Sequence, residues 1–521
     1  MDTAYATQSP WMSFPMPAHP PLPTDARADV CVVGAGIAGM STAYFLTRKG
    51  KRVIVIDDGP VGGGMTARTT AHLTCAIDDR YHEIERLHGE DGARLAAASH
   101  GAAIDAIEAV VEQEGIDCDF ARVDGYLFLP PEGAPEELLE EYGAALRAGV
   151  EGLEWVDRAP IAGFDTGRCL RFPRQGQFHP LKYLAGLARA IEREGGAIHC
   201  GEHAAQIEDG KCVRTSSGRR IDCEDIVVAT NSPINDRVAI HTKQAPYMTY
   251  VVAARVPRAT VAPALYWDTL DEYHYVRLDR PDGEILIVGG EDHKTGQADD
   301  AERRFANLEL WLRTRFPEAR EITHRWSGQV METQDYLAFA GRNPGDEHTY
   351  IVTGDSGMGM THGTIAGIVI TDLIHGAEIP WAQLYDPSRI RLKAARNFAK
   401  ENANVAWQYT DWIRSGSTET FETIPRGAGE VIRQGMRKIA AYRDDAGELH
   451  TFSAVCTHLG CPVAWNPAEK TWDCKCHGSR FDARGQVING PANQGLEPVE
   501  VSAPEVRISR QANTDRPTPP Q

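Results

Sequence analysis

The stretch ADVCVVGAGIAGMSTAYFLTRKGKRVIVIDDG, residues 28–59, places a glycine-rich turn between apolar segments. Its order predicts a strand over 29–33, a helix from the turn to about residue 48, and a second strand over 53–56. Gly34 permits the tight turn, Gly36 lets a pyrophosphate approach the backbone, and Gly39 lets helix and strand pack closely. The helix N-terminus then faces the phosphates with its partial positive charge. Asp57 ends the second strand, where a carboxylate accepts hydrogen bonds from an adenosine ribose, so we predict a dinucleotide-binding fold.

Length and composition narrow the class of protein further. A chain of 521 residues is too long for one ordinary core, so we expect two or three domains. The formal charge of -19, from 54 Lys and Arg against 73 Asp and Glu, argues against nucleic acid as a partner. We find no apolar run of roughly 18 residues or more and therefore expect no membrane span.

The N-terminal segment and the cysteines indicate the cellular compartment of the protein. Residues 1–27 are polar and proline-rich, without the basic start and apolar core of a signal peptide, and predict a disordered or extended arm. Of the 11 cysteines, four lie in one C-terminal stretch and the other seven are scattered. Scattered thiols suit a reducing compartment better than a disulfide framework, so we expect a cytoplasmic protein.

Three separated parts of the chain carry a family resemblance. They are VVGAGIAG (32–39) with VIVID (53–57), VVATNSP (227–233), and TQDYLAFAG (333–341) with YIVTGDSGMGMTHGTIAG (350–367). Together they resemble the FAD-dependent oxidoreductases of the D-amino-acid oxidase and glycine oxidase superfamily. The resemblance implies FAD as cofactor, a small-molecule substrate, and an α/β Rossmann-like FAD-binding domain interleaved with an antiparallel-sheet substrate domain.

The same resemblance implies which residues lie at the FAD. The last glycine turn would place backbone N–H groups beside the flavin pyrimidine, and the segment ARTTAHLT (67–74) would lie near the pyrophosphate or flavin. The residues expected to bind FAD are Gly34, Gly36, Ile37, Ala38, Gly39, Asp57, Arg68, Thr69, Thr70, Ala229, Thr230, Gly354, Gly357, Met358, Gly359, Met360 and Thr361.

The family resemblance does not identify the catalytic residues, and three candidates remain. Glycine oxidase-like enzymes have an arginine for the substrate carboxylate just after Trp-x-Gly, where this chain has Val330. Arg277 is the candidate to replace it, with a structural cation as the alternative. Tyr250 is expected either in an aromatic substrate cavity or in the core. His72 resembles a histidine that is covalently bonded to flavin in dimethylglycine-oxidising relatives, and a hydrogen-bonded histidine is the alternative.

The C-terminal stretch CTHLGCPVAWNPAEKTWDCKCHGSRFD, residues 456–482, contains two Cys-and-His pairs. Cys456-x-His458 and Cys474-x-x-His477 are separated by 15 residues and resemble the Rieske signature, in which two thiolates bind one iron and two imidazoles the other. Two Cys and two His also form a zinc set. The resemblance favours a 2Fe-2S cluster, because it extends to a disulfide between Cys461 and Cys476.

Two further positions belong to this resemblance. Ser479 matches a hydroxyl that donates to a cluster sulfide, and NGPA (489–492) resembles the proline loop over the cluster. Phe481 stands where high-potential Rieske proteins have a tyrosine that donates to a cysteine ligand. Since hydrogen bonds to sulfur help set the potential, we expect this cluster below the respiratory ones.

Domain boundaries follow from these motifs and from the hydrophobic pattern. We expect the arm over 1–27, an oxidoreductase part over 28–380, a helical linker over 381–420, an all-β Rieske domain over 421–510 and a tail over 511–521. FAD-binding segments at about 28–80, 175–240 and 325–380 alternate with substrate-domain segments at about 81–174 and 241–324. Residues 81–150 look helical, and 387–414 look like an amphipathic helix with one face formed by Ile390, Ala394, Phe398, Val405, Tyr409 and Trp412.

The two motifs together predict a function. Flavin takes two electrons from a substrate and a Rieske cluster carries one, so we expect a dehydrogenase of an amine or amino-acid-like compound that passes electrons singly to an external protein. Three alternatives remain open: a cluster-fed flavin reductase or monooxygenase-type component, a non-catalytic redox sensor, and a Rieske oxygenase. The last needs a mononuclear iron site, for which DDRYHEIERLH (78–88) offers Asp79, His82 and His88.

Overall fold

A six-stranded sheet carries the N-terminal glycine turn. Five strands run parallel, β2 (Val30–Val33), β3 (Val53–Asp57), β8 (Ala197–Cys200), β12 (Asp225–Val228) and β19 (Thr349–Thr353), and β18 (Phe339–Arg342) is antiparallel at one edge. The computed structural model describes residues 5–130, 133–235, 240–270, 273–409, 420–435 and 437–501. All four residues of β2 are buried, as expected for a parallel sheet that is covered on both faces.

Different layers cover the two faces of this sheet. Helices α1 (Ile37–Arg48), α4 (Pro180–Arg193) and α6 (Gly359–Ile374) share one hydrophobic core with Val30, Val32, Val53 and Val55. The opposite face packs on a four-stranded sheet of β1 (Ala26–Arg27), β9 (Ala204–Glu208), β10 (Cys212–Thr215) and β11 (Arg220–Asp222). The predicted dinucleotide-binding fold is confirmed.

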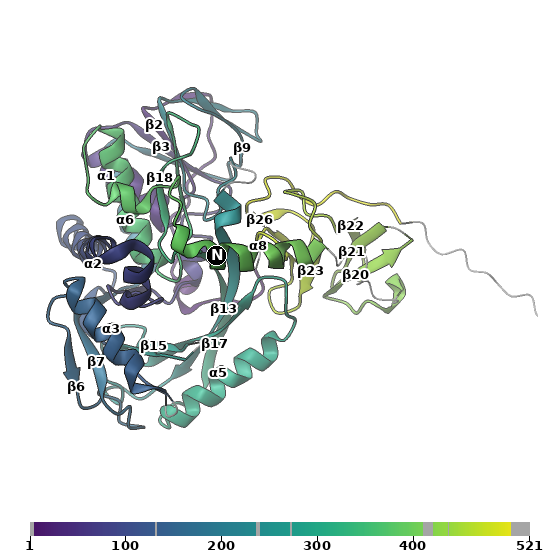
Figure 1. Ribbon diagram of the computed structural model, residues 1–521. Coiled ribbons are helices and arrows are strands. Elements are labelled where there is room, and N and C mark those ends of the chain that lie inside the picture. Colours follow the sequence, from purple (N-terminus) through teal and green to yellow (C-terminus); the bar gives the residue numbers. More distant parts are fainter. Residues whose placement is uncertain are drawn as a thin grey trace, which may run out of the picture.

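A nine-stranded sheet forms the second part (Figure 1). Its strands are β4 (His72–Leu73), β5 (Ala121–Phe128), β6 (Glu154–Val156), β7 (Cys169–Gln177), β13 (Gln244–Arg255), β14 (Ala264–Asp268), β15 (Tyr275–Leu278), β16 (Ile285–Lys294) and β17 (Ile322–Thr333). Neighbouring strands are antiparallel except β5 and β14, which are parallel. Helices α2 (Tyr81–Glu114), α3 (Pro135–Arg147) and α5 (Ala301–Arg315) lie in the chain between strands of this sheet, and segments of the two large sheets alternate along the chain.

Three sequence-based details were wrong. Residues 81–150 are not wholly helical, because β5 lies between α2 and α3, pairs with β7 and β14, and turns alternate side chains toward the core. Strands β7 and β17 cross the expected boundaries near residues 174 and 324 and belong to the nine-stranded sheet. The linker helix α8 (Ala395–Tyr409) begins later than expected, and Ile390 before it is 77% exposed rather than packed on one apolar face.

The N-terminal arm is extended along the protein and is not disordered over its described part. A short 3-10 helix, Pro10–Ser13, buries Trp11 and Met12 in a core shared with Trp326 of β17. The indole N–H of Trp11 also donates to the backbone oxygen of Thr69 at 2.7 Å. Trp412 and the tail over 511–521 lie outside the described residues.

The C-terminal part is all-β and lies to one side of the rest of the chain (Figure 1). One antiparallel sheet contains β20 (Ala428–Gln434), β21 (Arg437–Arg443) and β22 (Leu449–Ser453). A second contains β23 (Val463–Asn466), β24 (Thr471–Cys474), β25 (Arg480–Asp482) and β26 (Val487–Asn489). One Cys-and-His pair lies on the loop before β23; the other begins at Cys474, the last residue of β24, and continues into the loop that follows. Within the described part of the chain, no helix is long and apolar enough to span a membrane.

Candidate functional site

One cavity of about 1370 Å³ runs between the two sheets. Its volume exceeds the roughly 300–1,000 Å³ of ordinary small-ligand pockets, which suits a dinucleotide and a substrate together. The predicted FAD residues that line it are Gly34, Gly36, Ile37, Ala38, Asp57, Arg68, Thr69, Thr70, Ala229, Thr230, Gly354, Gly357, Met358, Gly359 and Met360. Gly39 and Thr361 are not in the cavity wall, and they contact the turns behind it.

The first glycine turn fits a pyrophosphate. A Cβ atom on Gly34 would lie 2.4 Å from the Ala229 oxygen, and one on Gly39 would lie 1.9 Å from the Gly34 oxygen, so neither position accepts a side chain. Gly36 lines the cavity. A Cβ atom added there would approach the Thr66 hydroxyl to 3.2 Å. This leaves the backbone at the start of α1 open to an anion.

Asp57 is held at the base of this turn. Its carboxylate accepts the N–H of Ala35 at 2.6 Å and that of Gly59 at 2.7 Å. Burial, together with the neighbouring Asp58, raises the pKa of Asp57 to about 7. A ribose hydroxyl beside this carboxylate would supply the polar partner that burial has removed, so the residues fit the adenosine half of FAD.

The second glycine turn also lines the cavity. Gly354 and Gly357 both have φ +73°, a left-handed conformation that glycine adopts without strain. Residues 354–360 line the cavity and lead into the N-terminus of α6, which directs backbone N–H groups at it. This arrangement fits a flavin pyrimidine, where negative charge develops on reduction.

His72 lies in the cavity wall on β4. Its Nδ1 is 3.0 Å from the Thr70 hydroxyl and its Nε2 is 3.4 Å from the Val276 oxygen. Burial, followed by the nearby positive charge of Arg277, lowers the pKa of His72 to about 3. The ring is therefore neutral, and it also contacts Trp267 and Tyr275.

Arg277 and Tyr250 do not line the cavity. Arg277 is fully buried and donates to backbone oxygens of Thr70, Ala71, Phe178, Leu278 and Asp279. Tyr250 is 2% exposed and bonds His293 at 2.9 Å. As substrate-contacting candidates both were wrong: Tyr250 belongs to the core beside the nine-stranded sheet, and the Arg277 guanidinium is enclosed by the backbone oxygens to which it donates.

Arg68 lines the cavity but its guanidinium is already occupied. It forms an ion pair with Glu469 of the C-terminal part and donates to the backbone oxygens of Ser327 and Thr7. Its contribution to a FAD site is therefore the shape of the wall, since the charge is already balanced by Glu469.

Three carboxylates line the cavity near the second turn, and of these the sequence predicted only Asp79, as a ligand of the alternative iron site. Tyr273 donates to Asp78 at 2.7 Å, and Asp79 and Glu332 lie in the same wall. Burial raises the pKa of Asp78 to about 6 and raises those of Asp79 and Glu332 well above their usual range. The signal was available for Glu332: it follows Val330 by two positions on one strand, and the alternation of β17 places both on the same face.

The predicted cluster ligands converge on two adjacent loops. The thiols of Cys456 and Cys474 lie within hydrogen-bonding distance of each other, and the rings of His458 and His477 are 5.1 Å apart. Nδ1 of His477 is buried and has no hydrogen-bond partner among the described residues, as expected of a nitrogen that binds a metal. Two thiolates and two imidazoles at this separation fit a Rieske cluster.

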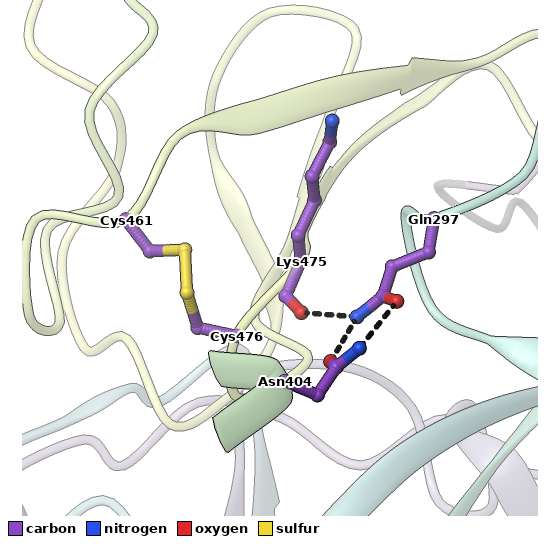
Figure 2. Close-up of a disulfide and its surroundings, with 5 residues drawn as sticks. All are labelled: Gln297, Asn404, Cys461, Lys475 and Cys476. Carbon is purple, nitrogen blue, oxygen red and sulfur yellow. Dashed lines mark hydrogen bonds between the residues drawn. A yellow bond between two sulfur atoms is a disulfide. The ribbon is translucent and has the colours of Figure 1, made fainter. Parts of the chain in front are cut away.

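The shell around these ligands also matches the expected pattern. The hydroxyl of Ser479 lies beside the sulfur of Cys456 and accepts the N–H of Ala492, within the NGPA segment. Cys461 and Cys476 form a disulfide that joins the two loops (Figure 2). The alternative iron site is not assembled, since His82 bonds Glu141 and His88 bonds the backbone oxygen of Asp335.

The cluster loops are docked on the rest of the protein. In Figure 2, Gln297 donates to the Lys475 oxygen at 3.1 Å and exchanges hydrogen bonds with Asn404 of α8. The His241 ring lies 5.0 Å from that of His458 and 6.2 Å from that of His477. Sequence reasoning missed these contacts, because no local pattern marks which surface a loop will cover.

Gln329 connects the two sites directly. The residue lines the cavity, and its side-chain Nε2 donates to the backbone oxygen of Gly478, the residue after His477, at 2.9 Å. The same side chain accepts from Asn489 at the end of β26. One side chain therefore separates the cavity from a cluster-ligand loop.

Comparison with known proteins agrees with both halves. Residues 29–373 match the DAO family of FAD-dependent oxidoreductases, and residues 412–500 match the Rieske [2Fe-2S] domain. The chain is 32% identical to YhfW of Bacillus subtilis, named as a Rieske 2Fe-2S iron-sulfur protein, over 94% of this chain and 96% of that protein.

A second curated relative and a solved structure each match part of the chain. Gamma-glutamylputrescine oxidoreductase of Escherichia coli is 28% identical over 67% of this chain and 84% of its own length. Glycine oxidase of Geobacillus kaustophilus superposes with a TM-score of 0.60 at 19% identity, covering 70% of this chain and all of that one.

Proposed function

We propose that this chain, which belongs to the DAO family of FAD-dependent oxidoreductases and also contains a Rieske domain, oxidises an amine and delivers the electrons one at a time to an external acceptor protein. Its cofactors are FAD and a 2Fe-2S cluster. The flavin accepts two electrons as a hydride equivalent, and the cluster carries one.

The observation that carries the proposal is the position of Gln329. Gln329 lines the cavity, and its side chain donates to the backbone oxygen of Gly478 in the loop that contains His477. His241, on the short helix that precedes β13, packs against both predicted histidine ligands. The cluster loops are therefore docked next to a residue of the cavity wall, which supports electron transfer between the two cofactors.

The lining of the cavity supports an amine over an amino acid. Both arginines among the described lining residues already have partners: Arg68 pairs with Glu469, and Arg80 donates to the backbone oxygens of Asp78 and Asp268. The carboxylates of Asp79 and Glu332 lie in the wall, and neither forms an ion pair among the described residues, although the charge of Arg80 acts on Asp79. Buried carboxylates of this kind favour a cationic ligand.

We assign the residues as follows. The glycine turns at 34–39 and 354–360 with Asp57 would hold FAD, and Cys456, His458, Cys474 and His477 would bind the cluster. We divide the chain at about 380 and 420 into the oxidoreductase part, the linker and the Rieske part. The scattered thiols outside the disulfide support a cytoplasmic location.

The test is an anaerobic substrate screen on the purified holoprotein. Primary and secondary amines, N-methyl amino acids and hydroxy acids are mixed with it in turn, and loss of the visible flavin absorbance is followed. We expect an amine to bleach the flavin and to produce the EPR signal of a reduced Rieske cluster. Glu332→Gln should raise the KM for that amine, with Glu302→Gln on the exposed face of α5 as the control.

The runner-up functions predict other outcomes. If the cluster feeds the flavin, a reduced one-electron donor protein would reduce the flavin through the cluster while no amine bleaches it. If the protein is a sensor, none of the compounds would bleach the flavin, and reduction of the cluster would leave the flavin oxidised. Either result would overturn the proposed dehydrogenase.

A further inference from the structure

The Rieske domain forms part of the wall of the FAD cavity. Residues of the segment 486–495, which follows β25 and includes β26, line the same cavity as Asp57 and Asp58. Asn493 of this segment lies beside His203 and Ala204, which follow β8 and lie near the C-terminus of β3. In a dinucleotide fold this is the end that receives the adenosine half of the ligand.

Asn493 makes the contacts across this boundary. Its side-chain N–H donates to the backbone oxygen of Ala204 at 3.1 Å, and its own backbone oxygen lies 3.2 Å from Nε2 of His203. The other ring nitrogen of His203 is 3.3 Å from a carboxylate oxygen of Asp58. A residue of the Rieske domain is thus connected to the strand end that carries Asp57.

The amide oxygen of Asn493 needs a donor. It is buried and has no hydrogen-bond partner among the described residues. A buried carbonyl oxygen without a partner is costly, and such atoms are usually satisfied by a ligand or water. Because Asn493 is one of the residues that line the cavity, a donor group on the adenosine half of the ligand would satisfy this oxygen.

We propose that the Rieske domain completes the adenosine end of the FAD site, with segment 486–495 as its outer wall and the amide oxygen of Asn493 as the acceptor for the adenine amino group. This inference rests on the proposed placement of the ribose at Asp57. Its consequence is that FAD cannot leave, or be reached from outside at that end, while the Rieske domain is docked.

The segment also connects the two cofactor sites. The N–H of Ala492, next to Asn493, donates to the Ser479 hydroxyl at 3.0 Å, and that hydroxyl lies beside the Cys456 sulfur. The hydroxyl of Thr457 donates to the Gln494 oxygen at 2.6 Å. A correctly folded cluster loop therefore holds the adenosine cover in position.

The test measures access to the adenosine end of the holoprotein. A nucleotide pyrophosphatase is added, and release of AMP is followed by chromatography, which detects opening of the cover whether or not the flavin is covalently held. Asn493→Ala should release AMP roughly fivefold faster than the wild type, as expected for one lost hydrogen bond. His450→Ala, in the outer sheet of the Rieske domain, is the matched control and should behave as the wild type.

A second variant separates recognition of adenine from simple docking. Asn493→Asp keeps an acceptor oxygen but loses the donor to Ala204, so it should release AMP at nearly the wild-type rate. Equal, fast release from the Ala and Asp variants would show that the Ala204 contact alone matters, and would overturn the role of the amide oxygen. Unchanged release from Asn493→Ala, with the cluster EPR signal intact, would overturn the cover itself. Neither readout needs a substrate, so failure of the amine screen is a separate result.

Discussion

Arg68 and Glu469 are 401 residues apart in the chain and form an ion pair in which both side chains are completely buried. The Glu469 carboxylate also accepts from the Thr7 hydroxyl, and from the N–H of Ser327 at 3.2 Å. The N-terminal arm, the substrate-domain sheet and the Rieske domain therefore meet at a single carboxylate. We interpret this buried ion pair as the main contact that holds the Rieske domain against the rest of the protein.

Removing the carboxylate should destabilise the protein strongly. Glu469→Ala leaves the Arg68 guanidinium buried without its counter-charge, which typically costs about 3–5 kcal/mol. We expect a loss of that size in the free energy of unfolding in urea. Glu90→Ala, which breaks the exposed pair with Arg94, should cost less than about 1 kcal/mol. Equal losses of unfolding free energy for the two variants would contradict this role of the buried ion pair.

The same pair predicts a pH dependence. Burial by itself would raise the pKa of Glu469, but Arg68 and Arg480 hold that pKa below its usual range. A carboxyl whose pKa is lower in the folded state contributes stability that is fully present above its unfolded pKa, about 4.3, and is lost as the pH falls through the folded value. Between neutral pH and pH values below the folded pKa, the wild type should therefore lose more stability than Glu469→Gln. An equal loss of unfolding free energy in the two proteins, measured by urea unfolding at both pH values, would refute this.

Phe481 should limit the potential of the cluster. Its side chain is fully buried in the same core as Cys456 and Cys474. Phe481→Tyr adds a hydroxyl that can donate to a ligand sulfur, and such donors raise the potential of iron–sulfur sites. Protein-film voltammetry should show a higher potential. An unchanged or lower value would mean that the loop directs the new hydroxyl elsewhere.

The flavin should not be covalently attached to His72. Both ring nitrogens have partners, the Thr70 hydroxyl and the Val276 oxygen, and the neutral ring is enclosed by aromatic side chains. After acid precipitation we expect the yellow colour in the supernatant. Colour that stays with the pellet of the wild type and is lost from the pellet of His72→Ala would establish a covalent bond instead.

Breaking the cluster should separate the two half-reactions. His458→Ala or Cys474→Ala removes a proposed ligand, while the glycine turns around the flavin are unchanged. Substrate should still bleach the flavin in one anaerobic turnover at a near-native rate, and steady-state transfer to a one-electron acceptor should collapse. The FAD content of each variant is measured alongside as the control.

Two results would contradict the proposed order, in which substrate reduces the flavin and the cluster then carries the electrons to the acceptor. A cluster-free variant that turns over normally with its acceptor protein would make the Rieske domain structural. Loss of flavin bleaching in a variant that retains FAD would place the cluster before the flavin.

The amino-acid sequence by itself determined the parts whose chemistry is local. The glycine turn at 34–39, the acid at Asp57, the second turn at 354–360 and the two Cys-and-His pairs each lie within a short run of residues. Their conformation depends on neighbouring backbone, on glycine and on strand ends, so the pattern predicted the dinucleotide-binding fold, and the family resemblances that these motifs carry implied both cofactors. The disulfide between Cys461 and Cys476 followed from the same family pattern and is present in the structure.

Only the tertiary structure decided how these parts face one another. The sequence could not show that Arg68 would be neutralised by Glu469, that Arg277 would point into the core, or that Gln329 and Asn493 would lie between the two sites. Each of these depends on the packing of segments that are far apart in the chain, where the burial of a charge or an amide is set by the opposing surface. A long side chain such as arginine has the same sequence signature in a binding site and in a buried ion pair, and its partner alone distinguishes the two.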